Sequence, residues 1–185
     1  MRGYFGIGVD GISKQMNIGS VFRTAHAFGA SFVFTVGAVY EADQGNLADT
    51  SDTPRNLPLY EFDSVEDLRL PTDCDLVGIE LMDEAVDLPS FRHPRCAAYV
   101  LGPERGALSP ELVARCAHVV KIPTKFSINL ALAGALVMYD RLLSSGRFGA
   151  RPVAAGGPVE APPLHQFGPP VIRRLKKETR GSKKA

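Results

Sequence analysis

The chain has 185 residues, a length typical of one ordinary domain with a tail, which excludes a large multidomain assembly. Hydrophobic residues make up 45% of the chain and charged residues 22%, close to the globular average, so neither a disordered chain nor a coiled coil is expected. No apolar run approaches the length of a membrane span or of a signal peptide core, so we expect a cytoplasmic protein with no membrane partner. The three cysteines are widely spaced, which predicts reduced core residues and no metal site.

The N-terminal half is predicted to contain two strands joined by a helix. Residues 4–12 and 31–39 are apolar at both alternate positions, which is typical of strands buried on both faces of a parallel sheet. Between them, Asn17 is expected to cap a helix with apolar residues at helical spacing, and Gly29 is a typical stop signal. Residues 46–58 are polar and show no periodicity, which predicts a long surface loop.

Three more strands and two helices are expected in the C-terminal half. A Ser-Pro-Glu run at residues 109–111 is a typical helix start, and the last helix is predicted from near Ser127 to Gly146. Because strands and helices alternate, the fold class is α/β with a parallel sheet, helices on both faces and right-handed crossovers. The strands are predicted at residues 75–81, 97–101 and 118–122.

The folded domain is expected to span residues 1–145. Residues 146–170 are rich in Gly, Pro and Ala, which predicts a linker. Residues 171–185 carry a net charge of +6, which leaves −5 on the rest of the chain. Such a basic tail is either an arm that contacts a polyanion such as RNA or a solvated, disordered terminus, and the sequence leaves both open.

A glycine pattern near the N-terminus matches the G-x-G-x-x-G spacing of dinucleotide-binding loops, at Gly6, Gly8 and Gly11. That kind of loop follows a complete strand, whereas only five residues precede Gly6. No Asp or Glu stands about twenty residues further on, where the position is Ser31. We therefore interpret the run as part of a strand and not as a pyrophosphate cradle.

Three segments, residues 17–30, 101–112 and 122–142, place polar side chains at strand ends or on helices. The first is an otherwise apolar-faced helix, the second a strand end that runs into a Gly-rich turn, and the third a strand end, a short loop and a helix start. Taken singly, each polar residue of these segments is typical of an ordinary surface, turn or helix-start position. These residues are Asn17, Arg23, Glu104, Ser127 and Asn129.

Together and in this order, the segments resemble the three signature motifs of the SpoU, or TrmH-like, branch of the SPOUT RNA methyltransferases. Motif one is N-x-G-x-x-x-R followed by A-x-x-F-G, motif two is a glycine and a glutamate in a Gly-rich turn, and motif three is I-P, then S-x-N and a long apolar helix. The resemblance covers about residues 3–145. The matching residues are Asn17, Gly19, Arg23, Ala25, Phe28, Gly29, Gly102, Glu104, Gly106, Ile122, Pro123, Ser127 and Asn129.

The resemblance implies a SPOUT-type fold with a C-terminal trefoil knot, an S-adenosyl-L-methionine pocket at the knot and a homodimer that completes the active site. Small or adaptable residues recur along one side of the last helix, between residues 131 and 138. This spacing suits either close approach of a second helix or packing within one chain. The cofactor-binding residues expected from the strand ends and turns are Ile79, Leu101, Gly102, Gly106, Ile122 and Ser127.

The activity that the resemblance implies is methyl transfer to a ribose 2′-hydroxyl of tRNA or rRNA, with Arg23 closest to catalysis. Because a guanidinium does not ordinarily release its proton, we interpret Arg23 as a phosphate anchor or a stabiliser of the developing alkoxide. Two alternatives stay open, an RNA-binding relative without catalysis and a SPOUT enzyme that methylates a base. The remaining catalytic candidates are expected to orient these groups through hydrogen bonds: Asn17, Glu104, Ser127 and Asn129.

Motif three is shorter than in many family members, because only residues 124–126 separate its proline from Ser127. Lys125 and Phe126 are therefore candidates for roles that other residues fill elsewhere. RNA recognition is expected to fall to the dimer surface, to residues 46–58 or to the basic tail.

Overall fold

The structure is a computed structural model, and the residues that it describes are 3–11, 15–37, 57–103, 106–146, 148 and 155–156. The chain divides into two compact units, residues 1–147 and 148–185, and every helix and strand described lies in the first. Most of the predicted loop at residues 46–58, nearly all of the predicted linker, the whole basic tail and Glu104 lie outside the described residues.

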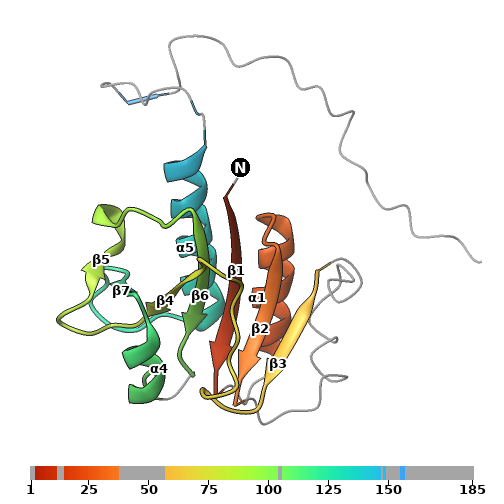
Figure 1. Cartoon of the computed structure of the whole chain (residues 1–185). Coiled ribbons are helices and arrows are strands. Elements are labelled where there is room, and N and C mark those ends of the chain that lie inside the picture. The colour runs from red at the N-terminus through yellow and green to blue at the C-terminus, as the bar shows by residue number, and fades with distance from the viewer. Residues whose placement is uncertain are drawn as a thin grey trace, which may run out of the picture. The chain divides into compact units, whose positions relative to one another are not determined.

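The first unit is built on a seven-stranded parallel sheet with the order β3-β2-β1-β6-β4-β7-β5 (Figure 1). The predicted α/β class and parallel sheet are confirmed, and the five predicted strands correspond to β1, β2, β4, β6 and β7. The strands are β1 (Tyr4–Asp10), β2 (Phe32–Val36), β3 (Leu59–Phe62), β4 (Asp75–Ile79), β5 (Val86–Asp87), β6 (Cys96–Leu101) and β7 (His118–Lys121). The two strands that were not predicted, β3 and β5, stand at the two edges of the sheet and lack fully buried residues, so no apolar run marks them.

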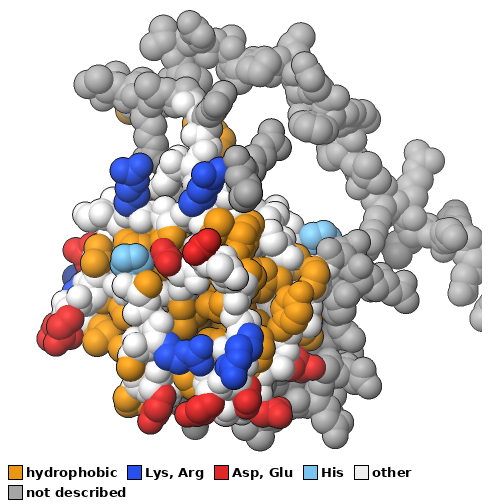
Figure 2. Space-filling view, viewed as in Figure 1, with side chains coloured by type: hydrophobic (Ala, Val, Ile, Leu, Met, Phe, Trp, Pro, Cys, Tyr) orange, Lys and Arg blue, Asp and Glu red, His pale blue; other side chains and the backbone are white. Residues whose placement is uncertain are grey.

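Helices cover both faces of the sheet, as predicted. On one face, α1 (Gln15–Ala27) and α5 (Leu130–Ser145) pack against each other. The other face carries α4 (Pro110–Arg115), and a short 3₁₀ helix, η1 (Leu88–Ser90), precedes β6. Figure 2 shows hydrophobic side chains gathered over the middle of the face seen in Figure 1. None of the helices in the described part of the chain is long and apolar enough to cross a membrane.

The helix boundaries correct two expectations in detail. The first helix begins at Gln15, so Asn17 lies within its first turn and not at its cap. It ends as predicted, because Gly29 adopts a φ of +73° and the N–H of Ala30 donates to the carbonyl of Ala25. The last helix begins at Leu130, with Asn129 as its cap, slightly later than the predicted start near Ser127.

The glycine pattern in β1 has a packing cause. A Cβ at Gly6 would lie 2.3 Å from the ring of Phe32, and one at Gly8 would lie 2.5 Å from the ring of Phe34. Both aromatic rings of β2 therefore lie across β1 at positions that only glycine leaves open. Gly6 and Gly8 are part of the strand, which confirms their interpretation as strand residues.

The small residues of α5 pack within the chain. Gly134 and Met138 are buried in the core, and a Cβ at Gly134 would lie 3.3 Å from the side chain of Leu101 and 3.4 Å from that of Ile7. Gly134 and Met138 on this side of the helix therefore pack within the chain. Another side of α5 presents exposed apolar side chains, at Leu132, Leu136 and Tyr139.

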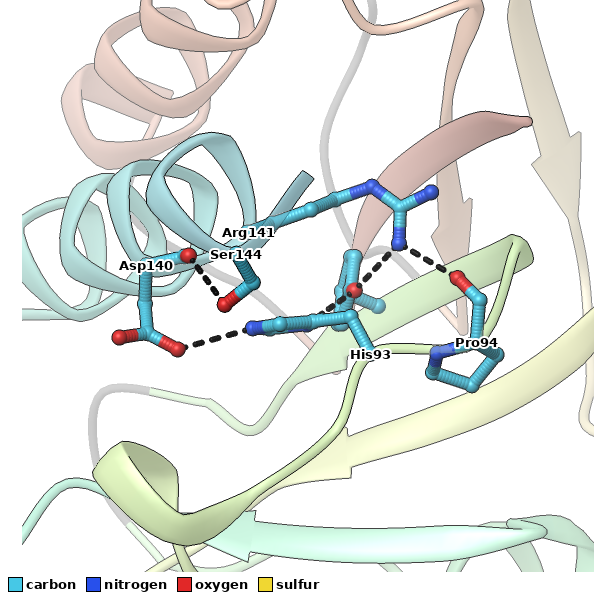
Figure 3. Close-up of polar contacts among 6 residues, drawn as sticks. His93, Pro94, Asp140, Arg141 and Ser144 are labelled. Carbon is cyan, nitrogen blue, oxygen red and sulfur yellow. Dashed lines mark hydrogen bonds and ion pairs between the residues drawn. The ribbon is translucent and has the colours of Figure 1, made fainter. Parts of the chain in front are cut away.

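A buried arginine fastens α5 to the amino ends of the central strands (Figure 3). The guanidinium of Arg141 donates to the carbonyl oxygens of Pro94 at 2.7 Å, Arg95 at 2.9 Å and Tyr4 at 3.2 Å. It also donates to the hydroxyl of Tyr99 at 3.0 Å. Because Arg141 is only 8% exposed, these four acceptors replace the water that its charge loses on folding.

The same cluster holds a histidine in its neutral form. His93 Nε2 lies 2.9 Å from the carboxylate of Asp140, and Nδ1 lies 2.6 Å from the hydroxyl of Tyr99 (Figure 3). A neutral ring donates to Asp140 and accepts the Tyr99 proton, whereas a protonated ring would leave that proton without an acceptor. Burial lowers the pKa of His93 and the charge of Arg141 adds to the lowering, while Asp140 opposes it.

We expect His93 to make the folded chain less stable in acid. Because its pKa is lowered, the folded chain binds fewer protons than the unfolded chain, so stability is lost as the pH falls below about 6.5. Urea denaturation should show a steeper fall in the free energy of unfolding for the wild type than for His93→Gln, by at most about 1.4 kcal/mol per pH unit. Parallel pH profiles for the two proteins would contradict this assignment.

Candidate functional site

A pocket with a volume of about 390 Å³ lies at the carboxyl edge of the sheet, where β4, β6 and β7 end. Open α/β sheets bind ligands at this edge, and the volume lies in the usual range for small-molecule sites, about 300–1,000 Å³. The walls come from residues 79–81, from the turn after β6, from parts of the segment 122–130 and from Asn17 of α1. The pocket therefore joins segments that are far apart in the sequence.

Most of the predicted site residues line this pocket. Arg23 is exposed on α1 and is not among the described lining residues, and Glu104 lies outside the described part of the chain. The structure thus brings together eight of the ten predicted residues. Those that line the pocket are Asn17, Ile79, Leu101, Gly102, Gly106, Ile122, Ser127 and Asn129.

One side chain links the first and last of the predicted motifs. The side-chain oxygen of Asn129 accepts from the N–H groups of Ala131 at 2.9 Å and Leu132 at 3.4 Å, and so caps α5. Its amide nitrogen donates to the side-chain oxygen of Asn17 at 3.3 Å. The start of α5 is thereby joined to the first turn of α1 on one wall of the pocket.

A second connection runs through Glu80, which the sequence analysis did not single out. Its two carboxylate oxygens accept from different backbone groups, the N–H of Leu81 at 2.8 Å and the N–H of Leu108 at 2.8 Å. Gly102 leaves room for this bond, since a Cβ there would lie 3.2 Å from the Glu80 carboxylate and 3.1 Å from the nitrogen of Leu108. Glu80 lies inside the strand predicted at residues 75–81 and directly after the observed end of β4, so an acid within an apolar run was the available signal.

The turn after β6 is also held from the end of β1. The buried carboxylate of Asp10 accepts from the N–H of Ser109 at 3.2 Å, at the start of α4. The start signal at residues 109–111 is confirmed, because Ser109 caps α4 in backbone position and Pro110 is its first residue. Two carboxylates, from Asp10 and Glu80, therefore fix the segment that follows the second motif.

The short loop of the third motif is closed by its own hydrogen bonds. The hydroxyl of Thr124 donates to the carbonyl of Phe126 at 2.9 Å, and the N–H of Thr124 donates to that of Ile122 at 2.7 Å. Lys125 and Phe126 are exposed and are not among the described lining residues, whereas Thr124 is. Thr124 therefore borders the pocket, and the next two side chains do not.

The residues that line the pocket suit a small organic molecule with apolar and polar parts. Ile79, Leu101, Ile122 and Leu130 form an apolar wall, and backbone groups and small polar side chains complete the lining. Within the described residues, no group of three or more His, Cys, Asp or Glu side chains is placed to hold a metal ion.

A parallel α/β sheet with a carboxyl-edge pocket walled by these three motif segments is the arrangement expected of a SPOUT-type methylase. The model of the SpoU rRNA Methylase family matches residues 5–139, and the chain belongs to this family. The match covers all seven strands except the first residue of β1.

Individual relatives are distant. Mouse tRNA (guanosine(18)-2′-O)-methyltransferase TARBP1 is 26% identical over 138 residues, which cover 70% of this chain and 9% of that protein. An AdoMet-bound rRNA methyltransferase from Sinorhizobium meliloti superposes with a TM-score of 0.69 at 22% identity, over 77% of this chain and 57% of the other. The SpoU methyltransferase AviRb from Streptomyces viridochromogenes superposes with a TM-score of 0.68 at 25% identity, over 80% of this chain and 62% of the other. The chain spans less than two thirds of each of these relatives.

The two functions of Asn129 are separable by substitution. Asn129→Ala removes the cap of α5 and should lower the free energy of unfolding by about 1 kcal/mol, whereas Asn129→Asp keeps a capping oxygen and should stay close to the wild type. Urea denaturation of the three proteins measures the difference. If Asn129→Asp loses as much stability as Asn129→Ala, the bond to Asn17 and not the cap is the important one.

Proposed function

We propose that the chain is an S-adenosyl-L-methionine-dependent methyltransferase that transfers a methyl group to a ribose 2′-hydroxyl of tRNA or rRNA. The observation that carries this proposal is that all three motif segments border one carboxyl-edge pocket, with Asn17 bonded to Asn129. Membership of the SpoU methylase family and the activities named for the relatives support it.

The pocket is proposed to hold the cofactor. Its volume and its apolar wall suit the adenine and ribose, and Gly102 leaves the backbone open to close approach. The polar side chains of Asn17, Ser127 and Asn129 also line the pocket and are proposed to supply hydrogen bonds. When bound, the cofactor supplies an already reactive methyl group.

The work left for the protein is to position the accepting oxygen and to exclude water. Positioning supplies the larger effect, since effective molarities for well-oriented reactants reach about 10⁵–10⁸ M, whereas a general base contributes about 10²- to 10⁴-fold. Arg23 is proposed to hold a substrate phosphate or to stabilise the negative charge that develops on the oxygen. Ser127 and Asn129 are proposed to orient the substrate at the pocket mouth.

A trefoil knot is proposed on the basis of the chain path. The helix α4 packs on one face of the sheet and α5 on the other, and β7, which joins them, lies between β4 and β5. The chain between β4 and β6 carries β5, so this connection crosses β7 on its way from β4 to β5. Threading of α5 through this connection would account for the path and agrees with the family resemblance.

A homodimer is proposed on the basis of α5 and Arg23. The side chains of Leu132, Leu136 and Tyr139 form a stripe at i, i+4 and i+7 and are 61%, 43% and 47% exposed. An apolar stripe on an amphipathic helix is the kind of surface that a second copy covers. Because Arg23 is not among the described residues that line the pocket, a second copy that brings Arg23 to it would complete the site.

The reaction is tested by incubating the purified chain with isotopically labelled S-adenosyl-L-methionine and total RNA, followed by separation by size and digestion to nucleosides. Label in one RNA class as a 2′-O-methyl nucleoside would support the proposal and identify the substrate class. Label on a base would indicate a base-methylating enzyme. Cofactor binding without label in any RNA would favour a relative that has lost catalysis.

Arg23→Ala should separate binding from turnover. We expect the affinity for S-adenosyl-L-methionine, measured by calorimetry, to stay nearly unchanged, because Arg23 is exposed on α1 and is not among the described residues of the pocket wall. Methyl transfer should fall by about 10²- to 10³-fold or more, as for loss of a group that stabilises developing charge. Arg92→Ala, at another exposed arginine, is the control. A parallel fall in affinity and transfer would place Arg23 in cofactor binding instead.

Leu136→Glu should disrupt the proposed dimer. A charge in the middle of the exposed stripe opposes burial against a second copy, so light scattering should show a monomer with an unchanged circular dichroism spectrum. Ala114→Glu adds the same charge to an exposed position of α4 and should leave the mass unchanged. If the Leu136→Glu protein is still a dimer, the interface does not lie on this stripe of α5.

A further inference from the structure

We propose that Glu80 is a specificity-determining residue of the pocket, whose carboxylate favours the positively charged methyl donor over the neutral thioether that remains after transfer. The proposal rests on the proposed function, since it takes the pocket to be the cofactor site. It starts from one side chain that the motifs do not include and that the structure places in the pocket wall.

The carboxylate of Glu80 is held in one position. One oxygen accepts from Leu81 and the other from Leu108, each at 2.8 Å, so the side chain bridges the end of β4 and the turn after β6. Each carboxylate oxygen can accept more than one hydrogen bond, so both keep capacity for a further donor. The charge is therefore fixed in the wall and available to a ligand.

The charge of Glu80 is also unusual for its surroundings. Among the described residues that line the pocket, Glu80 alone carries a formal charge, and the others are apolar residues, glycine, proline and small neutral polar residues. The close contact between a basic and an acidic side chain found within the described residues, between His93 and Asp140, belongs to the cluster around Arg141, which anchors the opposite, amino edge of the sheet. No described cation therefore pairs with Glu80.

A fixed anion of this kind discriminates between ligands that differ in charge. S-adenosyl-L-methionine carries one more positive charge, at sulfur, than S-adenosyl-L-homocysteine, and the two are otherwise alike in shape. Charges interact more strongly in a half-buried site than in water, where the dielectric constant is high. The pocket would therefore hold the donor more tightly than the spent cofactor, which assists exchange after each turnover.

The test compares the two ligands on the full chain by calorimetry. Glu80→Gln keeps the size of the side chain but removes the charge, and it leaves one oxygen in place of two for the N–H groups of Leu81 and Leu108. We expect affinity for S-adenosyl-L-methionine to fall about tenfold and that for S-adenosyl-L-homocysteine by about threefold or less. Glu84→Gln is the control, because Glu84 is exposed and is not among the described lining residues. We expect it to leave the affinities for both ligands unchanged.

A ratio of affinities is insensitive to a general loss of structure, which would weaken both ligands alike. Glu80→Asp, which keeps the charge on a shorter side chain, should preserve the ratio even if both affinities fall. Equal losses of both ligands in Glu80→Gln, or no loss of either, would overturn the proposal. A wild type that binds neither ligand would contradict the proposed function itself. A wild type that binds both ligands, with equal losses in Glu80→Gln, would contradict only the proposal for Glu80.

Discussion

The pocket depends on the hydrogen bonds of one amide, that of Asn129. A helix that starts at the edge of a sheet leaves its first N–H groups without partners inside the helix. The oxygen of Asn129 satisfies the N–H groups of Ala131 and Leu132, and its nitrogen is still free to bind Asn17. An aspartate at this position would cap the helix but has no amide donor for the second bond. The choice of asparagine therefore joins the two helices on this face at the wall of the pocket.

The parallel sheet decides where charge is placed. The central strands β1 and β6 are buried on both faces, so polar chemistry is confined to the two ends of the sheet. At the amino end, Arg141 is enclosed by backbone carbonyls and fastens α5. At the carboxyl end, Asp10 and Glu80 accept backbone N–H groups from the turn after β6. One end is closed by a buried cation, and the other is organised by anions around a cavity.

The parts of this arrangement that were predictable from the sequence are those with a local signal. Continuous apolar runs predict the inner strands, and the Ser-Pro-Glu run at residues 109–111 predicts the start of α4. The edge strands β3 and β5 lack that signal because an edge strand has little to bury. Glu80 was missed for a different reason, because an acid after a strand is common and its partner Leu108 lies 28 residues away. Gly6 and Gly8 show the reverse case, a motif-like spacing with a purely steric cause.

The proposed roles of Arg23 and Glu80 follow from the same electrostatics. In the proposed reaction the donor is a cation, and two unit charges about 4 Å apart interact by about 4 kcal/mol at an effective dielectric constant near 20. The carboxylate of Glu80, which lines the pocket, would therefore favour binding of the donor. Arg23 is exposed on α1 and is proposed to contact a phosphate of an RNA. The substrate would then bring its own negative charge to Arg23, so the donor and the acceptor are held by residues of opposite sign.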